Sequence, residues 1–162
     1  MRSLIIGFGN ELRGDDGVGL AVLRSLEARV LPEGVRCADV GIGGVALVHE
    51  LQAGWDRLVI IDAVQRGGAP GTVYVLSPQL PDLATLPEQE RNDLLVDAHM
   101  AEPYHALVLA QALGVLPRRV DVVGVEAPET EELSLELSPA VARAVPIAAQ
   151  RALELASDPV AV

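Results

Sequence analysis

The sequence predicts a three-layer α/β domain with a mostly parallel sheet. Short apolar runs of strand length alternate with longer segments that have helical spacing. The clearest run, Arg57–Val64, is rich in β-branched residues and apolar on both faces, as a central parallel strand should be. The chain has 162 residues, close to the usual length of one domain, so we expect a single domain over residues 1–156 and a short tail over 157–162.

The first half of the chain predicts two strand–helix units. Ser3–Gly7 is a short buried strand that leads into a glycine-rich loop, and Val18–Val30 follows it with apolar residues at helical spacing. Val35–Val40 predicts the second strand and Val45–Ala53 the second helix. The third strand, Arg57–Val64, comes next.

A tight turn separates the third strand from the fourth. Gly67–Gly71 is too short a connection to return a parallel strand, so we expect the strand Thr72–Leu76 to run antiparallel. A helix over Tyr104–Leu113 and a strand over Val120–Glu126 form the last strand–helix unit.

The segment Ser77–Ala98 has three prolines and five acidic residues. Structureless loops longer than about 15 residues are uncommon in compact domains unless they serve a function. Two interpretations therefore stay open: either Pro87–Leu95 forms a short helix, or the segment is a mobile rim beside a site.

The last helix has a strong start signal. Ser138 is expected as its N-cap and Pro139 as its first helical residue. Pro146 lies inside the helix and should kink it or remove one backbone hydrogen bond. The expected core-facing stripe consists of Val141, Val145, Ala148, Ala152 and Leu155.

Composition excludes several classes of protein. Every basic residue is arginine, so lysine Schiff bases, P-loop lysines and Ser–Lys dyads are absent. The net charge of −11, with no basic tract, argues against nucleic acid and anionic membranes as partners. Cys37 is the only cysteine, which excludes a disulfide framework and cysteine-clustered metal sites. The first apolar run is too short for a signal peptide or membrane span, and we expect a cytoplasmic protein.

The densest motif lies between Gly7 and Gly19. Its Gly-x-Gly after the first strand suggests a dinucleotide site, with Asp39 as the candidate ribose ligand. The fingerprint fails, because its third glycine would fall at Leu12. Two carboxylates also stand where a pyrophosphate would need N–H groups and positive potential.

Three acidic residues need an explanation. Asp15 and Asp16 directly precede a helix; we interpret Asp15 as a helix cap, whereas for Asp16 both a capping and a functional role stay open. Asp62 ends the most hydrophobic strand, where a carboxylate is costly unless it reaches solvent, a hydrogen bond or a metal. Ligands bind at this edge of open α/β sheets, where strand order reverses, although a turn-capping role for Asp62 is the alternative.

The histidines differ in their surroundings. His99, in the loop before a helix, would complete a carboxylate–carboxylate–imidazole set with Asp16 and Asp62; alternatively it is an ordinary loop histidine. Such a set suits Ni²⁺ or Zn²⁺ and leaves coordination positions open. We interpret His49 and His105 as helix residues without a site role, and Cys37 as a core residue. No serine stands in a Gly-x-Ser-x-Gly elbow, and no His-Glu-x-x-His motif occurs.

These residues together resemble one family. The sequence is similar to the hydrogenase maturation endopeptidases, in order from Arg2 to about Leu155. The matching features are Gly-x-Gly-Asn-x-Leu-x-x-Asp-Asp-Gly-x-Gly, Asp62-Ala63, Pro70–Thr72, His99, Val123–Glu126 and Leu137-Ser138-Pro139.

The resemblance implies a fold and a metal site. The fold would be a five-stranded mixed sheet of the phosphorylase/hydrolase-like type, in the order 2-1-3-5-4 with strand 4 antiparallel. The family's metal ligands match Asp16, Asp62 and His99, and its members have either Glu or Asp at the first of these positions.

The resemblance also implies an activity. The family removes a C-terminal extension from the precursor of a nickel–iron hydrogenase large subunit, after nickel insertion. The expected partner is therefore a nickel-loaded precursor that supplies the Ni²⁺, while Zn²⁺ or another divalent ion would occupy the site in isolation. We expect Asp16, Asp62 and His99 to form the recognition and cleavage site, and the chain to act as a monomer.

Two other functions stay open. One is a non-catalytic metal-reading chaperone of hydrogenase assembly that uses the same three ligands. The other is a different hydrolase on this fold, aminopeptidase-like or peptidyl-tRNA-hydrolase-like; the acidity of the chain argues against the tRNA version. Ile42 and the segment Met100–Tyr104 depart from the family pattern, which bears on substrate specificity more than on metal binding.

Overall fold

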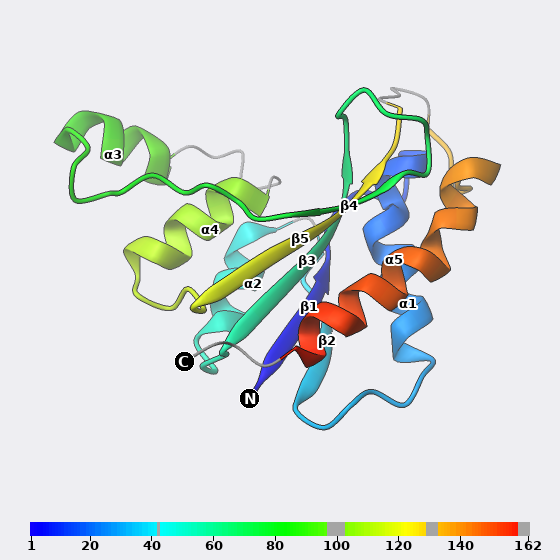
Figure 1. Cartoon of the computed structure of the whole chain (residues 1–162). Helices are drawn as coiled ribbons and strands as arrows, with labels where there is room; N and C mark the ends of the chain where they lie inside the picture. The colour runs from blue at the N-terminus through cyan, green and yellow to red at the C-terminus, as the bar shows by residue number, and fades with distance from the viewer. Residues whose placement is uncertain (42, 97–102, 129–132, 159–162) are drawn as a thin grey trace.

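The sheet has five strands in the order β2-β1-β3-β5-β4 (Figure 1). β1 pairs in parallel with β2 and β3, β3 pairs in parallel with β5, and β4 runs antiparallel to β5. The computed structural model describes residues 1–41, 43–96, 103–128 and 133–158. The strands are β1 (Ser3–Gly7), β2 (Val35–Asp39), β3 (Arg57–Val64), β4 (Val73–Leu76) and β5 (Arg119–Glu126). The expected order and the antiparallel fourth strand are confirmed.

Helices cover both faces of the sheet, so the molecule has three layers (Figure 1). α1 and α5 pack together on one face, and α2 and α4 pack together on the other. The helices are η1 (Gly14–Gly17, a 3₁₀ turn), α1 (Val18–Glu27), α2 (Gly44–Leu51), α3 (Glu88–Val96), α4 (Pro103–Ala112) and α5 (Pro139–Ser157). Each expected helix is present, with ends shifted by at most three residues, as is usual where helices fray.

Successive side chains of the central strands point to opposite faces and fill two separate cores. Ile5 of β1 and Val59 of β3 pack with α1 and α5, whereas Leu4 and Leu58 pack with α2 and α4. All four are fully buried. Burying an aliphatic side chain of this size contributes about 1.5–3 kcal/mol, so the two aliphatic cores compensate for the small number of aromatic residues.

α5 begins as predicted and buries further small residues beside the expected stripe. The Ser138 hydroxyl accepts a hydrogen bond from the Val141 N–H, and Pro139 is the first helical residue. The expected stripe faces the core, with Val141, Ala148 and Ala152 buried and with Val145 and Leu155 half-buried against the same core. The buried residues are Val141, Ala144, Ala148, Ala149, Ala152 and Ala156. Small side chains let α5 lie close to the sheet, while Pro146 is exposed inside a continuous helix.

The segment after β4 contains a short helix, which decides between the two interpretations offered for Ser77–Ala98. α3 occupies the expected position and contacts α4 away from the sheet (Figure 1). Residues 97 and 98 lie outside the described part, as do residues 159–162 of the expected tail. α5 itself continues to Ser157, the first residue assigned to that tail.

A buried charge cluster lies at the end of the sheet where β3 and β5 begin. Arg57 is completely buried, and its Nε lies 3.9 Å from Oδ2 of Asp121, which also accepts a 3.0 Å hydrogen bond from Arg119. Within the described chain, none of the three guanidinium nitrogens of Arg57 has a hydrogen-bond partner. Burial, together with the charge of Arg119, lowers the pKa of Arg57.

Candidate functional site

The carboxyl ends of β1 and β3 open into a cavity of about 500 Å³. Five parts of the chain build its wall: the loop after β1, the end of β3, the segment after β4, the start of α4, and β5. The lining residues are Gly9, Asn10, Arg13, Asp16, Asp62, Ala63, Gln65, Pro78, Pro103, Tyr104, Leu107 and Val122. β1 lies between β2 and β3, so the cavity stands where strand order reverses, the usual ligand position in open α/β sheets.

Asp16 lies in η1 and is half-buried on the cavity wall. Its Oδ2 accepts a 2.9 Å hydrogen bond from the Asn10 N–H, which fixes the direction of the carboxylate. The backbone passes so close that a Cβ on Gly9 would lie 1.8 Å from the Asp16 carbonyl oxygen. Gly9 also has φ of +122°, a conformation that other residues rarely adopt. The loop therefore needs glycine at this position to place Asp16.

The other glycines of the motif serve packing as well. A Cβ on Gly19 would lie 2.2 Å from the carbonyl oxygen of Phe8 and 2.4 Å from that of Ile61. α1 can therefore start directly against β1 and β3 only because Gly19 has no side chain. Close packing of backbone accounts for the glycines that superficially suggest a nucleotide-binding loop.

Asp62 lies at the carboxyl end of β3, opposite Gly124 of β5. It is half-buried, and its Oδ1 accepts a 2.9 Å hydrogen bond from the Ala63 N–H. Asp16 and Asp62 are 46 positions apart in sequence and line the same cavity. The parallel pairing of β1 and β3 brings the two carboxylates to one edge of the sheet.

The capping role expected for Asp15 is wrong. The residue before α1 is Gly17, and no side chain caps that helix. Asp15 is instead buried at 6% exposure, and its Oδ1 accepts a 2.6 Å hydrogen bond from the Ser138 N–H at the start of α5. Asp15 therefore holds the loop after β1 to the start of the last helix.

The third member of the predicted metal set, His99, lies outside the described residues. Among the residues that the structure does describe, no three His, Cys, Asp or Glu side chains are close enough together to hold a metal ion. Asp16 and Asp62 thus place two carboxylates on the cavity wall, and the whole ligand set stays a prediction.

The remaining candidates do not line the cavity. His49 is exposed on α2, and the His105 ring on α4 makes an edge contact with the Tyr104 ring, with 5.6 Å between the ring centroids. Cys37 packs half-buried against the core on the α1/α5 face, and burial raises the pKa of its thiol to about 11. These placements agree with the structural roles expected for all three residues.

Two cavity residues were not predicted. Arg13 brings a cation to a wall that also has two carboxylates, and Tyr104 brings an aromatic ring that is 39% exposed. Arg13 lies inside the glycine-rich motif, and Tyr104 within the segment expected to bear on specificity; their positions were a signal that sequence reasoning did not use. Ile42 and residues 100–102 lie outside the described part.

Glu126, at the end of β5, organises the turn next to the cavity. Its carboxylate accepts hydrogen bonds from the N–H groups of Arg66 and Gly67, at 3.0 and 3.1 Å. Burial raises the pKa of Glu126, but these N–H groups and the Tyr74 hydroxyl outweigh it, so the pKa is lowered. Gln65, which directly precedes Arg66 and Gly67, lines the cavity.

Comparison with known proteins assigns the family. A family model described as HycI, hydrogenase maturation protease, matches residues 20–155. The chain therefore belongs to the hydrogenase maturation protease family, which makes it a hydrolase of the peptidase class. None of the described helices is both long and apolar enough to span a membrane.

Individual relatives agree with this assignment. The hydrogenase 2 maturation protease of Escherichia coli strain K12 is 33% identical over 144 residues, covering 87% of this chain and 82% of the relative. The hydrogenase expression/formation protein HupM of Azotobacter chroococcum is 34% identical over 157 residues, covering 91% and 72%.

Solved structures show the same fold. The hydrogenase maturating endopeptidase HybD from Escherichia coli matches with a TM-score of 0.75 and 30% identity, covering 96% of this chain and 91% of that one. The [NiFe] hydrogenase maturation protease HybD from Thermococcus kodakarensis matches with a TM-score of 0.71 and 32% identity, covering 97% and 100%.

Proposed function

We propose that this chain removes the C-terminal extension of a nickel–iron hydrogenase large-subunit precursor, after nickel insertion, and that it uses the inserted nickel to recognise the precursor. The observation that supports this proposal is the position of Asp16 and Asp62 on the wall of one cavity at the carboxyl edge of the sheet. In the proposal the chain acts as a monomer.

The donor chemistry fits a divalent cation. Carboxylate oxygens bind such ions, and a carboxylate has about four acceptor sites, so the hydrogen bond from Asn10 orients Asp16 without using all of them. His99 is the proposed third ligand, and its imidazole would make the set suitable for Ni²⁺. In the isolated chain, Zn²⁺ or another divalent ion would bind the same side chains.

Three protein ligands leave the coordination shell incomplete. A nickel ion that the precursor already holds brings the precursor's own ligands with it, and these can complete the shell. Nickel is therefore part of the substrate. A precursor without nickel offers the two carboxylates nothing to bind, and its scissile segment is not held in position. Each tenfold preference for the loaded precursor requires about 1.4 kcal/mol of differential binding, which is small for metal–carboxylate contacts.

A cleavage assay tests the proposal. Nickel-loaded and nickel-free precursor are incubated with the chain, and the mass of the large subunit is followed. We expect a mass loss with loaded precursor alone, and none with the Asp62→Asn variant. Asp56→Asn is the matched control, because Asp56 directly precedes the opposite end of β3.

The same assay separates the alternatives. Tight binding of loaded precursor without any cut would assign the chain to metal-reading chaperones. Cleavage of short peptides in the absence of nickel would assign it to another hydrolase activity on this fold. Either result would overturn the proposal.

A further inference from the structure

Three exposed leucines lie together beside the cavity. Leu12 is 55% exposed, Leu133 is 82% exposed and Leu135 is 76% exposed. With Ser134 they line a shallow depression of about 210 Å³. We call these three residues the leucine surface. Clusters of exposed apolar side chains on a protein surface often mark interaction sites.

The backbone under the leucine surface is held by hydrogen bonds. The Ser134 N–H donates to the Leu12 carbonyl at 2.9 Å, and the Gly14 N–H donates to the Ser134 carbonyl at 2.7 Å. The two segments form a short parallel bridge between Arg13 and Ser134. Segments about 120 positions apart thus present their leucines from one ordered backbone, although neither segment buries them.

The leucine surface adjoins the loop that lines the cavity. Leu12 and Arg13 are neighbours, and Arg13 lines the cavity together with Asp16. One loop therefore presents an apolar side chain to solvent and polar side chains to the site. A protein that places a segment in the cavity therefore comes close to the leucine surface.

Charge narrows the kind of partner. The chain has a net charge of −11, yet none of the described residues that line the depression is charged. The depression therefore fits an apolar patch of a folded protein better than a nucleic acid.

We propose that Leu12, Leu133 and Leu135 dock an apolar patch on the body of the hydrogenase large-subunit precursor. This inference rests on the proposed function and adds the surface that holds the substrate outside the cavity. It predicts two separable contributions: the leucine surface contributes the part of the affinity that does not depend on nickel, whereas the carboxylates contribute the part that does and hold the scissile segment for cleavage.

Steady-state cleavage of nickel-loaded precursor tests the docking surface. We expect the double variant Leu133→Ser/Leu135→Ser to raise KM about tenfold or more and to leave kcat unchanged, since about 1.4 kcal/mol corresponds to a factor of ten and burying one leucine contributes at least that. Leu113→Ser is the matched control: Leu113 is 56% exposed and follows α4 at the opposite edge of the sheet, where β5 begins.

Two results would overturn the docking surface. One is an unchanged KM in the double variant while the unsubstituted chain cuts normally. The other is a concentration-dependent dimer, in sedimentation of the chain alone, that the double variant loses, because the leucines would then serve self-association. Failure of the unsubstituted chain to cut loaded precursor would instead overturn the proposed function, and the docking surface with it. Thermal unfolding of each variant confirms that the fold is intact.

Discussion

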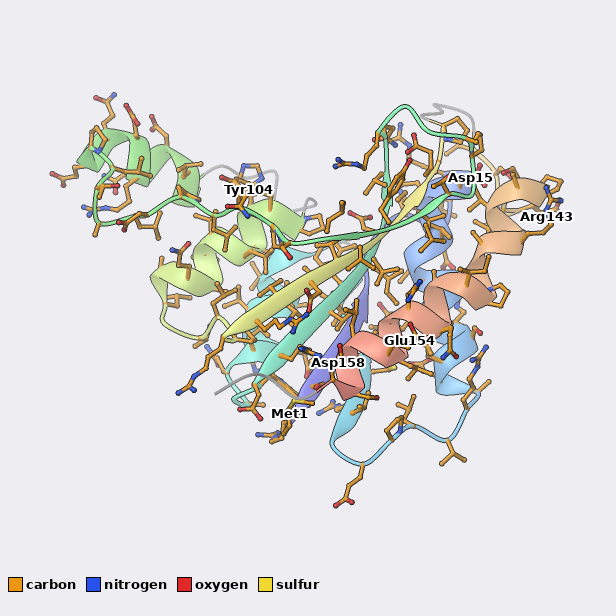
Figure 2. All side chains as sticks on the ribbon, in the orientation of Figure 1. Met1, Asp15, Tyr104, Arg143, Glu154 and Asp158 are labelled. Atoms are coloured by element: carbon orange, nitrogen blue, oxygen red, sulfur yellow. The ribbon has the colours of Figure 1, made fainter. Side chains whose placement is uncertain are left out.

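The carboxylate of Asp15 accepts a 2.6 Å hydrogen bond from the backbone N–H of Ser138, 123 positions further along the chain. The side chain of Ser138 in turn caps α5. Ser138 therefore binds the loop after β1 through its backbone N–H and caps the last helix through its hydroxyl. Asp15 lies beside the N-terminal end of α5 (Figure 2). Because Asp16 follows directly, this contact fixes one wall of the cavity to the helix that covers the sheet.

Removing that acceptor should destabilise the fold. Asp15→Ala leaves the Ser138 N–H without its partner, and we expect a loss of about 1–3 kcal/mol in the free energy of unfolding, measured by urea denaturation. Asp15→Asn keeps an acceptor oxygen and should lose less. Equal stability of the alanine variant and the unsubstituted chain would show that the contact contributes nothing.

The buried cluster at the opposite edge should respond to loss of its anion. Asp121 is 3% exposed and serves both Arg119 and Arg57. Asp121→Ala leaves the Arg57 charge buried and uncompensated, so we expect a loss of about 3–5 kcal/mol in the free energy of unfolding.

A second substitution separates charge from packing in that cluster. Arg57→Met combined with Asp121→Leu removes both buried charges and should recover most of the loss, because apolar residues of similar volume replace such pairs without cost or with a gain. If the double variant is as unstable as Asp121→Ala, then packing rather than uncompensated charge determines stability here.

Cys37 should be a poor nucleophile in the folded chain. Burial raises the pKa of its thiol from 9.0 to about 11, which makes the thiolate fraction at pH 8 about a hundredfold smaller. We therefore expect slow alkylation by iodoacetamide until the chain is unfolded in urea. Because the pKa is higher in the folded chain, the protonated thiol contributes fully to the free energy of unfolding below pH 9, and this contribution is lost as pH rises toward 11. Alkylation of the folded chain at the rate of the unfolded chain would contradict this expectation.

The turn after β3 should loosen in acid. The pKa of Glu126 is lowered below 4.5, so its contribution to stability is present above that pH and is lost as pH falls through the lowered pKa. Hydrogen-exchange protection factors of the Arg66 and Gly67 amides, measured against pH, should fall in that range. Glu126→Gln should show weaker protection without the pH dependence; a pH dependence that survives in this variant would assign it to another group.

Sequence reasoning could predict the sheet because the signals for it are local. The apolar character of Arg57–Val64 predicted a central strand, and the tight turn Gly67–Gly71 predicted the antiparallel fourth strand. The convergence of Asp16 and Asp62 was expected on the condition that the first and third strands are neighbours, which the family resemblance implied, because carboxyl ends of neighbouring parallel strands share an edge. Their roles as metal ligands remain predictions, as does the role of His99.

Features that depend on distant partners could not be predicted. Capping is a local rule, so Asp15 was expected to cap α1, whereas its partner Ser138 lies more than a hundred positions away. The stripe of α5 was predicted from helical spacing, which did not include Ala144 and Ala149; both are buried because this helix packs closely on the sheet. Leu133 and Leu135 are exposed on either side of Ser134, whose bridge to Arg13 joins segments that no local pattern relates.

The central claim is that Asp16 and Asp62 bind the nickel ion that the precursor holds. The most direct measurement is the affinity of the chain for nickel-loaded and nickel-free precursor, determined by rapid mixing before cleavage, in the unsubstituted chain and in the Asp16→Asn/Asp62→Asn variant. We expect nickel to raise the affinity about tenfold or more in the unsubstituted chain, equivalent to about 1.4 kcal/mol, and to have no effect in the double variant. An equal gain from nickel in both proteins would contradict the claim.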